Sequence, residues 1–196
     1  DCYVGVDLAA TSDLTAVAYL VVQDGTYYFK THYYLPESAL KDKADKELYK
    51  YWKQQGYLTV TSGNVTDYDY ITADMLRYAD VVNIQSVGYD KYNATQWAID
   101  STEQGLPLEE YPQTLGNFNM PTRELERRIL SGKAVIDNNE INRYCFRNVT
   151  LKSDYNGNVK PNKAVDKKKI DGTIAMIQAL GMYLRTPHYT NEILTI

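Results

Sequence analysis

Three strand signals follow one another at the start of this sequence, before any helix signal. Apolar or β-rich runs cover residues 3–9, 14–22 and 26–35, and Asp24-Gly25 between the last two is typical of a tight hairpin turn. Consecutive strands joined by such short turns are antiparallel, because a parallel pair needs a long crossover. The chain therefore begins with an antiparallel meander.

After Pro36 the pattern changes to strands that alternate with helices. Strands are predicted over 57–61, 84–89 and 108–114, with an extended pair around the turn Asn156-Gly157. Helices are predicted over 37–55, 67–82, 93–104, 121–130, 138–146 and 168–185. Asn93 and Pro121 are expected to begin their helices. This order predicts an α/β fold, a mixed β-sheet of three antiparallel strands and then parallel strands, flanked by helices.

Length, charge and cysteine count narrow the class of protein. The chain has 196 residues, 44% of them hydrophobic and 23% charged, as expected of one folded domain. Its net charge of −4 argues against a protein that coats DNA, and no apolar stretch reaches the roughly 18 residues that span a bilayer. Cys2 and Cys145 form no disulfide framework, which indicates a reducing cytosolic compartment. Without an initiator methionine or a signal peptide, we expect a fragment of a longer protein.

Two predicted strands end in the same way. Gly5-Val6-Asp7 and Gly88-Tyr89-Asp90 each place a glycine two positions before an aspartate, on the same face of the strand. The glycine leaves room for a close partner behind the acid. A third acid, Asp171, begins the last predicted helix, whose inner side carries small residues. If Asp7 and Asp90 are on neighbouring strands, they lie about 5 Å apart, and Asp171 can join them.

Carboxylates this close repel each other unless a cation lies between them. The repulsion is roughly 3 kcal/mol at an effective dielectric near 20. An all-oxygen site suits Mg²⁺ or Mn²⁺, and two such ions can activate a water and stabilise the leaving oxygen of a phosphodiester. A lone aspartate at a strand end is more often a turn residue, but the three together predict catalytic metal ligands at Asp7, Asp90 and Asp171. Asp13 is either an auxiliary ligand or a turn residue.

Lysines gather just before Asp171 in this acidic chain. They are Lys160, Lys163, Lys167, Lys168 and Lys169. We interpret the segment as a candidate contact for the phosphate backbone of DNA, with a solvated loop as the alternative. The many tyrosines are interpreted mainly as packing residues of strands and helices rather than as a platform for bases.

The residues around the acids resemble a known family. The segments 5–16, 87–90 and 163–175 are similar, in order and spacing, to the acidic motifs of the nuclease domain of HK97-like large terminase subunits from tailed bacteriophages. The resemblance covers essentially the whole chain, with a domain expected over 1–186 and a tail over 187–196. It implies an RNase H-like endonuclease that uses Mg²⁺ or Mn²⁺ to cut concatemeric viral DNA during packaging.

The same resemblance implies site residues and partners. Asp7, Asp90 and Asp171 match the metal-binding acids of the family, and Asp13 matches an acid that assists in some members. The implied partners are double-stranded DNA, an ATPase domain in the same polypeptide, a small terminase subunit and a portal protein, in the host cytoplasm and with no membrane. The segment 131–134 lacks the first glycine and the hydroxyl of a phosphate-binding loop, so we expect no ATPase domain in this chain.

Two other functions fit part of the pattern. A Gly-x-Asp strand end followed by a Thr/Ser turn also resembles the phosphate-binding opening of actin, sugar kinases and chaperone ATPases, although Leu8-Ala9-Ala10 stands where that group has glycine. A catalytically dead RNase H-like module that only binds DNA is the other alternative. Stabilisation by ATP would favour the first, and a melting temperature that Mn²⁺ does not change would favour the second.

Overall fold

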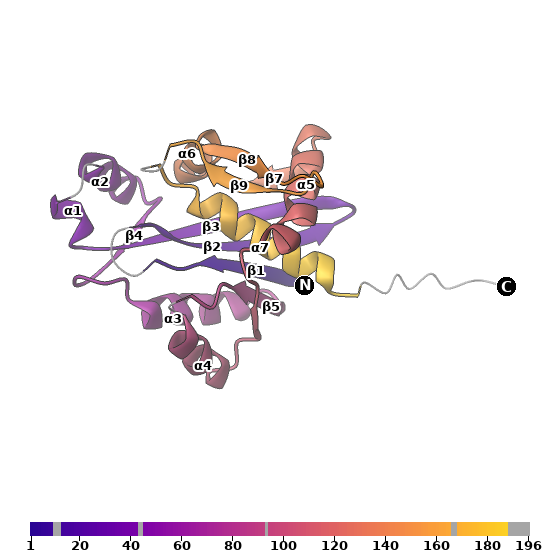
Figure 1. Cartoon of the computed structure of the whole chain (residues 1–196). Coiled ribbons are helices and arrows are strands. Elements are labelled where there is room, and N and C mark those ends of the chain that lie inside the picture. The colour runs from indigo at the N-terminus through magenta and orange to yellow at the C-terminus, as the bar shows by residue number, and fades with distance from the viewer. Residues whose placement is uncertain (10–12, 43–44, 93, 166–167, 188–196) are drawn as a thin grey trace.

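A mixed seven-stranded sheet forms the centre of the molecule. The computed structural model describes residues 1–9, 13–42, 45–92, 94–165 and 168–187 (Figure 1). The strand order is β4-β3-β2-β1-β5-β6, and β7 pairs with β3 as well. These strands are β1 (Cys2–Asp7), β2 (Thr15–Gln23), β3 (Thr26–Pro36), β4 (Thr59–Thr61), β5 (Ile84–Tyr89), β6 (Leu108–Glu110) and β7 (Ala134–Ile136). A separate two-stranded sheet contains β8 (Val149–Ser153) and β9 (Val159–Lys163).

The strand directions confirm the predicted architecture. β1, β2 and β3 are antiparallel neighbours, whereas β5 runs parallel to β1 and β6 runs parallel to β5. The β2–β3 hairpin turns at Asp24 and Gly25, whose φ angles of 50° and 71° are those of the tight turn that the sequence predicts. The sheet is therefore antiparallel from β1 to β3 and parallel from β1 to β6, and the short strands β4 and β7 both pair parallel with β3.

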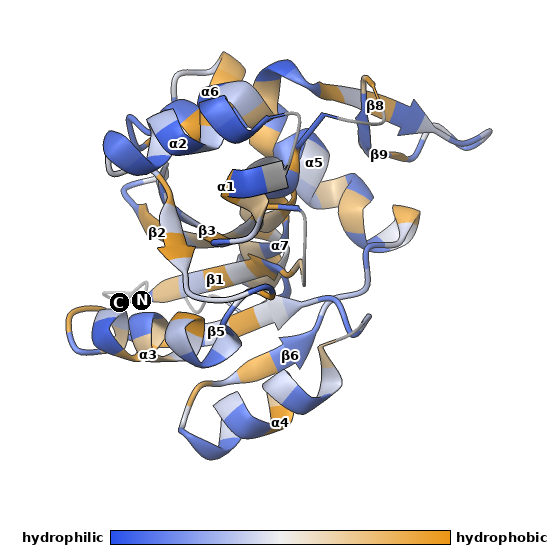
Figure 2. Ribbon diagram, turned by 90° about the vertical axis from the view of Figure 1, so that its left-hand side faces the viewer, coloured by the Kyte–Doolittle hydropathy of each residue, from blue (hydrophilic) through white to orange (hydrophobic). Residues whose placement is uncertain are grey.

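Helices cover both faces of the sheet (Figure 1). They are α1 (Ala39–Asp42), α2 (Lys46–Gln54), α3 (Tyr68–Ala79), α4 (Thr95–Glu103), α5 (Leu115–Leu130), α6 (Glu140–Arg147) and α7 (Asp171–Arg185). One face packs on α7, and the other packs on α3 and α4 through Ile71, Met75 and Trp97. The strands β1 and β2, buried between the two layers, are coloured mainly as hydrophobic in Figure 2.

The last helix is buried on all sides. Every residue from 171 to 182 is buried, because α7 lies between the sheet and an outer layer that contains α5 and α6 (Figure 1). The helix is apolar enough to be buried, because isoleucine, leucine, methionine and alanine occupy most of its positions. None of the described helices is long and apolar enough to cross a membrane.

The prediction that a helix begins at Pro121 is wrong. α5 begins six residues earlier at Leu115, where the Thr114 hydroxyl oxygen accepts a hydrogen bond of 3.3 Å from the Asn117 amide. Inside a helix, proline removes one backbone bond, to the carbonyl four residues before it. That carbonyl, of Asn117, instead accepts a hydrogen bond of 2.6 Å from the Tyr111 hydroxyl. A contact from outside the helix therefore makes the internal proline tolerable.

Other boundaries also differ from the prediction. The single helix predicted over 37–55 is two, α1 and α2, and Asp45 precedes the second, as aspartate favours helix starts over helix interiors. The last helix begins at Asp171 rather than at 168, and β7 was not predicted. β6 ends before Pro112, which has no N–H to continue the ladder. Asn93, the predicted cap of α4, lies outside the described residues.

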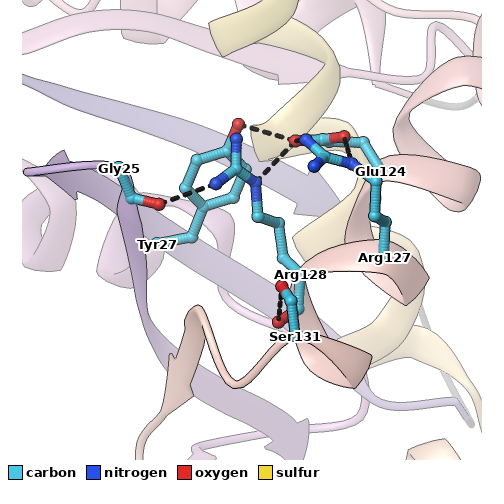
Figure 3. A network of polar contacts seen from close by, with 6 residues as sticks. All are labelled: Gly25, Tyr27, Glu124, Arg127, Arg128 and Ser131. Carbon is cyan, nitrogen blue, oxygen red and sulfur yellow. Dashed lines mark hydrogen bonds and ion pairs between the residues drawn. The ribbon is translucent and has the colours of Figure 1, made fainter.

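One polar network ties the β2–β3 hairpin to the end of α5 (Figure 3). The Arg128 guanidinium lies over the Tyr27 ring, 4.4 Å from its centroid, and donates to the Gly25 carbonyl at 2.8 Å. Glu124 accepts hydrogen bonds from Tyr27, Arg127 and Arg128. Tyr27 and Glu124 are 97 residues apart in the sequence, and Gly25 and Arg128 are 103 residues apart, so the network fixes α5 on the sheet.

Candidate metal centre

Asp7 and Asp90 stand at the ends of two neighbouring parallel strands. Gly5 lies opposite Gly88 and Val6 lies opposite Tyr89 in the β1–β5 register. Asp7 is the last residue of β1, and Asp90 follows the last residue of β5. The two Gly-x-Asp segments thus lie side by side in the sheet, at the carboxyl ends of the strands. These are the ends where α/β sheets place their ligand sites.

The two glycines allow α7 to lie directly on the sheet. A Cβ atom on Gly5 would collide with the backbone of Ala175 and Ala179 in α7. A Cβ atom on Gly88 would come within 2.7 Å of the Met182 side chain in the same helix. The close approach brings the first residue of α7, Asp171, to the end of the sheet where Asp7 lies.

Asp7, Asp13 and Asp171 line one cavity of about 370 Å³. Lys160, Lys163 and Gln113 line it too. Asp171 is 7% exposed, and its Oδ2 atom has no hydrogen-bond partner among the described residues. A buried carboxylate oxygen without a donor is costly, since its hydration is lost and nothing replaces it. The cavity therefore contains an anionic group that a cation would satisfy.

Burial and mutual repulsion make this cavity unfavourable for negative charge. The pKa of the Asp171 carboxyl is raised to about 6, mainly by burial and also by the charge of Asp13, although a hydrogen bond from its own backbone N–H and the charges of Lys163 and Lys169 act to lower it. Burial also raises the pKa of Asp7 well above its usual value, and the next largest cause is the charge of Asp171. The two acids are thus close enough to influence each other, as expected for groups that share one site.

Gln113 connects two of the predicted acids, and the sequence analysis missed it. Its side-chain amide donates to Asp7 Oδ1 at 3.0 Å, and its backbone N–H donates to Asp90 Oδ2 at 2.9 Å. Asp90 Oδ1 accepts a second hydrogen bond, of 2.9 Å, from the Tyr92 amide. Glutamine carries no catalytic signature, but Gln113 follows the third parallel strand, β6, where site residues are expected.

Three of the predicted DNA-contacting lysines make contacts at the site, two of them with Asp13. The Lys160 ammonium donates to the Gln113 carbonyl at 3.0 Å. Lys169 forms an ion pair with Asp13 Oδ1, and the Lys163 ammonium is 3.9 Å from Asp13 Oδ2. Lys168 is exposed, with its ammonium 5.7 Å from the Tyr144 ring centroid. Lys167 lies outside the described residues.

The donor set fits a hard divalent cation. Asp7, Asp90 and Asp171 offer carboxylate oxygens, the ligands that Mg²⁺ and Mn²⁺ prefer. No three histidine, cysteine or acidic side chains among the described residues already surround a single point closely enough to hold an ion. Mg²⁺ usually binds through one or two carboxylates and keeps several waters, so a cavity of about 370 Å³ with a buried, unpartnered Asp171 oxygen is suited to it.

The histidines and cysteines are not among the predicted site residues. His32 is on β3 and contacts Asp74 at 3.0 Å and the Tyr78 hydroxyl at 2.9 Å, so it belongs to the opposite helix layer. His188 lies outside the described residues. Cys2 and Cys145 are both free and buried, in agreement with the expectation that they form no disulfide.

This strand order, with acids at the ends of the two central parallel strands and at the start of the covering helix, is that of an RNase H-like α/β domain. Comparison with known proteins identifies the family. Residues 1–186 match the family described as "Terminase large subunit, endonuclease domain", and the chain belongs to that family. The resemblance that the sequence analysis found in the acidic motifs is thereby confirmed.

Individual relatives agree with this assignment. The chain is 28% identical to the terminase large subunit of Enterobacteria phage HK97 over 184 residues, which is 91% of this chain and 36% of the relative. It is 32% identical to protein YmfN of Escherichia coli K12, covering 92% of this chain and 42% of the relative. The chain thus spans about two fifths of the length of these curated relatives.

Solved structures share the fold. The crystal structure of the HK97 large terminase superposes with a TM-score of 0.83 at 28% identity, over 92% of this chain and 39% of that one. The large terminase nuclease of thermophilic phage G20c, solved with bound magnesium, has a TM-score of 0.61 at 12% identity, over 91% and 79%. These matches confirm the predicted α/β fold.

Proposed function

We propose that this domain is a metal-dependent endonuclease that cleaves concatemeric double-stranded DNA during viral genome packaging. Asp7, Asp90 and Asp171 hold Mg²⁺ or Mn²⁺, two ions in all, and Asp13 is an auxiliary ligand. Membership of the terminase endonuclease family supports the activity. The magnesium bound to the phage G20c nuclease, which has the same fold, supports the choice of cofactor.

The observation that carries the proposal is the buried Oδ2 of Asp171. It has no donor among the described residues, yet it belongs to a residue that lines the same cavity as Asp7. A structural aspartate at the start of a buried helix would be expected to accept hydrogen bonds with both oxygens. An oxygen left without a partner beside a second carboxylate is better explained by a cation that binds there.

The protein's own part in catalysis is to hold ions and DNA in place. When bound, the ions would lower the pKa of an attacking water and stabilise the leaving oxygen of the phosphodiester. Asp7 and Asp90 are fixed by the sheet register and Asp171 by a buried helix, so little reorganisation is needed. Lys160, Lys163, Lys167, Lys168 and Lys169 are proposed to hold the DNA backbone by charge.

The partners form a further part of the proposal. Double-stranded DNA is the substrate, and an ATPase domain in the same polypeptide would move it. The curated relatives, of which this chain covers 36% and 42%, are long enough to include an ATPase domain beside the part that this chain matches. A small terminase subunit and a portal protein complete the proposed assembly, which works in the host cytoplasm.

A digest of supercoiled and linear DNA tests the activity. The wild-type protein is incubated with Mn²⁺, Mg²⁺ or EDTA, beside Asp90→Asn and the control Asp69→Asn, whose aspartate is exposed on α3. We expect cleavage by the wild type and Asp69→Asn with either metal, none in EDTA, and none by Asp90→Asn. Cleavage by Asp90→Asn at the wild-type rate would refute the metal-site assignment, and a wild type that never cuts would refute the activity.

A further inference from the structure

Gln113 stands on a backbone that is fixed on both sides. Before it, the Tyr111 amide donates to the Tyr89 carbonyl at 2.6 Å, which continues the β5–β6 pairing beyond the last residue of β6. After it, Thr114 caps α5 through the Asn117 amide. Tyr111 is itself buried, with its ring against Gly181 of α7. The position of the Gln113 backbone is therefore set by the sheet, by α5 and by α7 together.

From this fixed position Gln113 makes three polar contacts, two with residues that line the cavity and one with Asp90, which lies outside the cavity lining. The side-chain amide reaches Asp7, the backbone N–H reaches Asp90, and the carbonyl accepts from Lys160. The two acids belong to strands that are neighbours only in the folded sheet, and the lysine belongs to the separate β8–β9 sheet. Gln113 thus contacts Asp7, Asp90 and the ammonium group of Lys160.

The two hydrogen bonds to the acids leave room for a ligand. Each occupies one oxygen, Asp7 Oδ1 and Asp90 Oδ2, at 3.0 Å and 2.9 Å, and Asp90 Oδ1 accepts one further bond, from the Tyr92 amide. A carboxylate accepts up to about four bonds, so both groups keep lone pairs that can face a metal ion. Outer partners of this kind fix the orientation of a metal-binding side chain before the ion arrives.

We propose that Gln113 is a positioning residue, which holds the carboxylates of Asp7 and Asp90 in one orientation for a shared divalent cation. This inference rests on the proposed function of the site. The side-chain half of the contact is removable by mutation, whereas the backbone half is kept by any residue other than proline. Substitution therefore isolates the link to Asp7 and leaves the link to Asp90 in place.

The test compares Gln113→Met with the wild type. Methionine has a similar length but no amide, so the chain is expected to fold with the hydrogen bond to Asp7 absent. Gln96→Met is the matched control, because Gln96 also donates to an aspartate, Asp100, at 2.7 Å, but on the exposed surface of α4. Gln113→Ala is the second variant, in case the sulfur interferes with the cavity.

Mn²⁺ affinity is measured by calorimetry, and cleavage is followed against Mn²⁺ concentration and DNA concentration. We expect both Gln113 variants to bind Mn²⁺ at least about tenfold more weakly than the wild type. Their kcat at low Mn²⁺ should fall while KM for DNA is unchanged, and saturating Mn²⁺ should restore much of the loss. Melting in EDTA checks that the variants are folded, and Gln96→Met should match the wild type throughout.

The outcomes separate this inference from the proposed function. If the wild type binds Mn²⁺ and cuts DNA but Gln113→Met and Gln113→Ala do so equally well, the positioning role is refuted and the nuclease proposal stands. If the wild type neither binds Mn²⁺ nor cuts, both are refuted. A variant that is unfolded in EDTA would refute the role as stated, because Gln113 would then support the fold rather than the metal site.

Discussion

Gly5 and Gly88 lie opposite each other in the parallel β1–β5 register, and α7 crosses both of them. The contacts differ in kind. A Cβ atom on Gly5 meets backbone atoms of α7, which cannot move without moving the helix, whereas a Cβ atom on Gly88 meets the Cγ and Sδ atoms of the Met182 side chain. The two glycines have the same place in the sequence pattern but unequal freedom to change.

This difference predicts unequal costs for two matched substitutions. Gly88→Ala is expected to reduce the free energy of unfolding by about 1–2 kcal/mol, because Met182 can shift to another rotamer. Gly5→Ala is expected to cost more than about 3 kcal/mol or to prevent folding, because α7 must move away from the sheet. Urea unfolding followed by circular dichroism measures both. Equal losses of unfolding free energy in the two variants would contradict the close packing of α7 on β1.

A second prediction concerns the buried charge at the start of α7. In EDTA, Asp171→Asn should be as stable as the wild type or more stable, because the neutral amide removes a buried, unpartnered anion. With Mn²⁺ at about 100 times its dissociation constant, the wild type should gain about 2.7 kcal/mol. Asp171→Asn should gain much less.

Thermal melting with EDTA and with Mn²⁺ measures this prediction, with Asp69→Asn as the exposed control. A wild type whose melting temperature does not respond to Mn²⁺ would favour the catalytically dead alternative over the nuclease. A variant that keeps the full Mn²⁺ response would remove Asp171 from the set of metal ligands.

The sequence led to the acids but not to the residue that connects them. Asp7 and Asp90 were found because a repeated Gly-x-Asp pattern indicates a strand end with room behind it, and the register of β1 and β5 brings the two patterns together. Gln113 has no such signal, since its role depends on where the loop after β6 returns in space. Its neighbourhood could be anticipated only from the rule that residues after parallel strands line sites.

Helix boundaries failed where a tertiary contact overrode a local preference. Pro121 favours a helix start locally, but the Tyr111 hydroxyl supplies the hydrogen bond that the proline removes. β7 was missed because three residues of an edge strand have too short a pattern to stand out, and its pairing with β3 is formed only in the folded sheet. Local propensity predicts element types well here, and long-range contacts decide where they end.

A third prediction concerns the lysines that the proposed function assigns to DNA. Lys163→Ala should weaken binding of double-stranded DNA and reduce the salt dependence of binding by about one phosphate contact. Lys133→Ala is the control. Lys133 is exposed and lies beside Tyr27, near the first residue of β3, which is the end of that strand that lies far from Asp7. Binding is measured by fluorescence anisotropy over a range of salt concentrations. An unchanged salt slope for Lys163→Ala would indicate that Lys163 only neutralises Asp13.

A fourth prediction follows from the network of Figure 3. Burial alone would raise the pKa of Glu124, but hydrogen bonds from Arg127, Arg128 and Tyr27 lower it more, to about 2. A carboxyl whose pKa is lower in the folded state stabilises the fold above its usual pKa, about 4.5, and this contribution is lost as the pH falls toward 2. Between pH 7 and pH 3 the loss should be on the order of 2 kcal/mol, because the Glu124 carboxyl is still mostly ionised in the folded state at pH 3.

Comparison with Glu124→Gln isolates this contribution from those of other carboxyls. Urea unfolding of both proteins at pH 7, 4.5 and 3 should show a stability difference that is largest at pH 7 and shrinks at pH 3. A difference that stays constant over this range would mean that Glu124 is not ionised in the network, or that the arginines contact solvent instead.

The last prediction tests how α5 accommodates its internal proline. Tyr111→Phe removes the hydroxyl that bonds to the Asn117 carbonyl and should cost about 1 kcal/mol. In a Pro121→Ala background the new alanine N–H can bond to the same carbonyl, so Tyr111→Phe should then cost less. Urea unfolding of the wild type, both single variants and the double variant gives the coupling energy. Equal costs for Tyr111→Phe in both backgrounds would show that the tyrosine does not replace the missing backbone bond. The start of α5 at Leu115 would then depend on the Thr114 cap and on packing against α7.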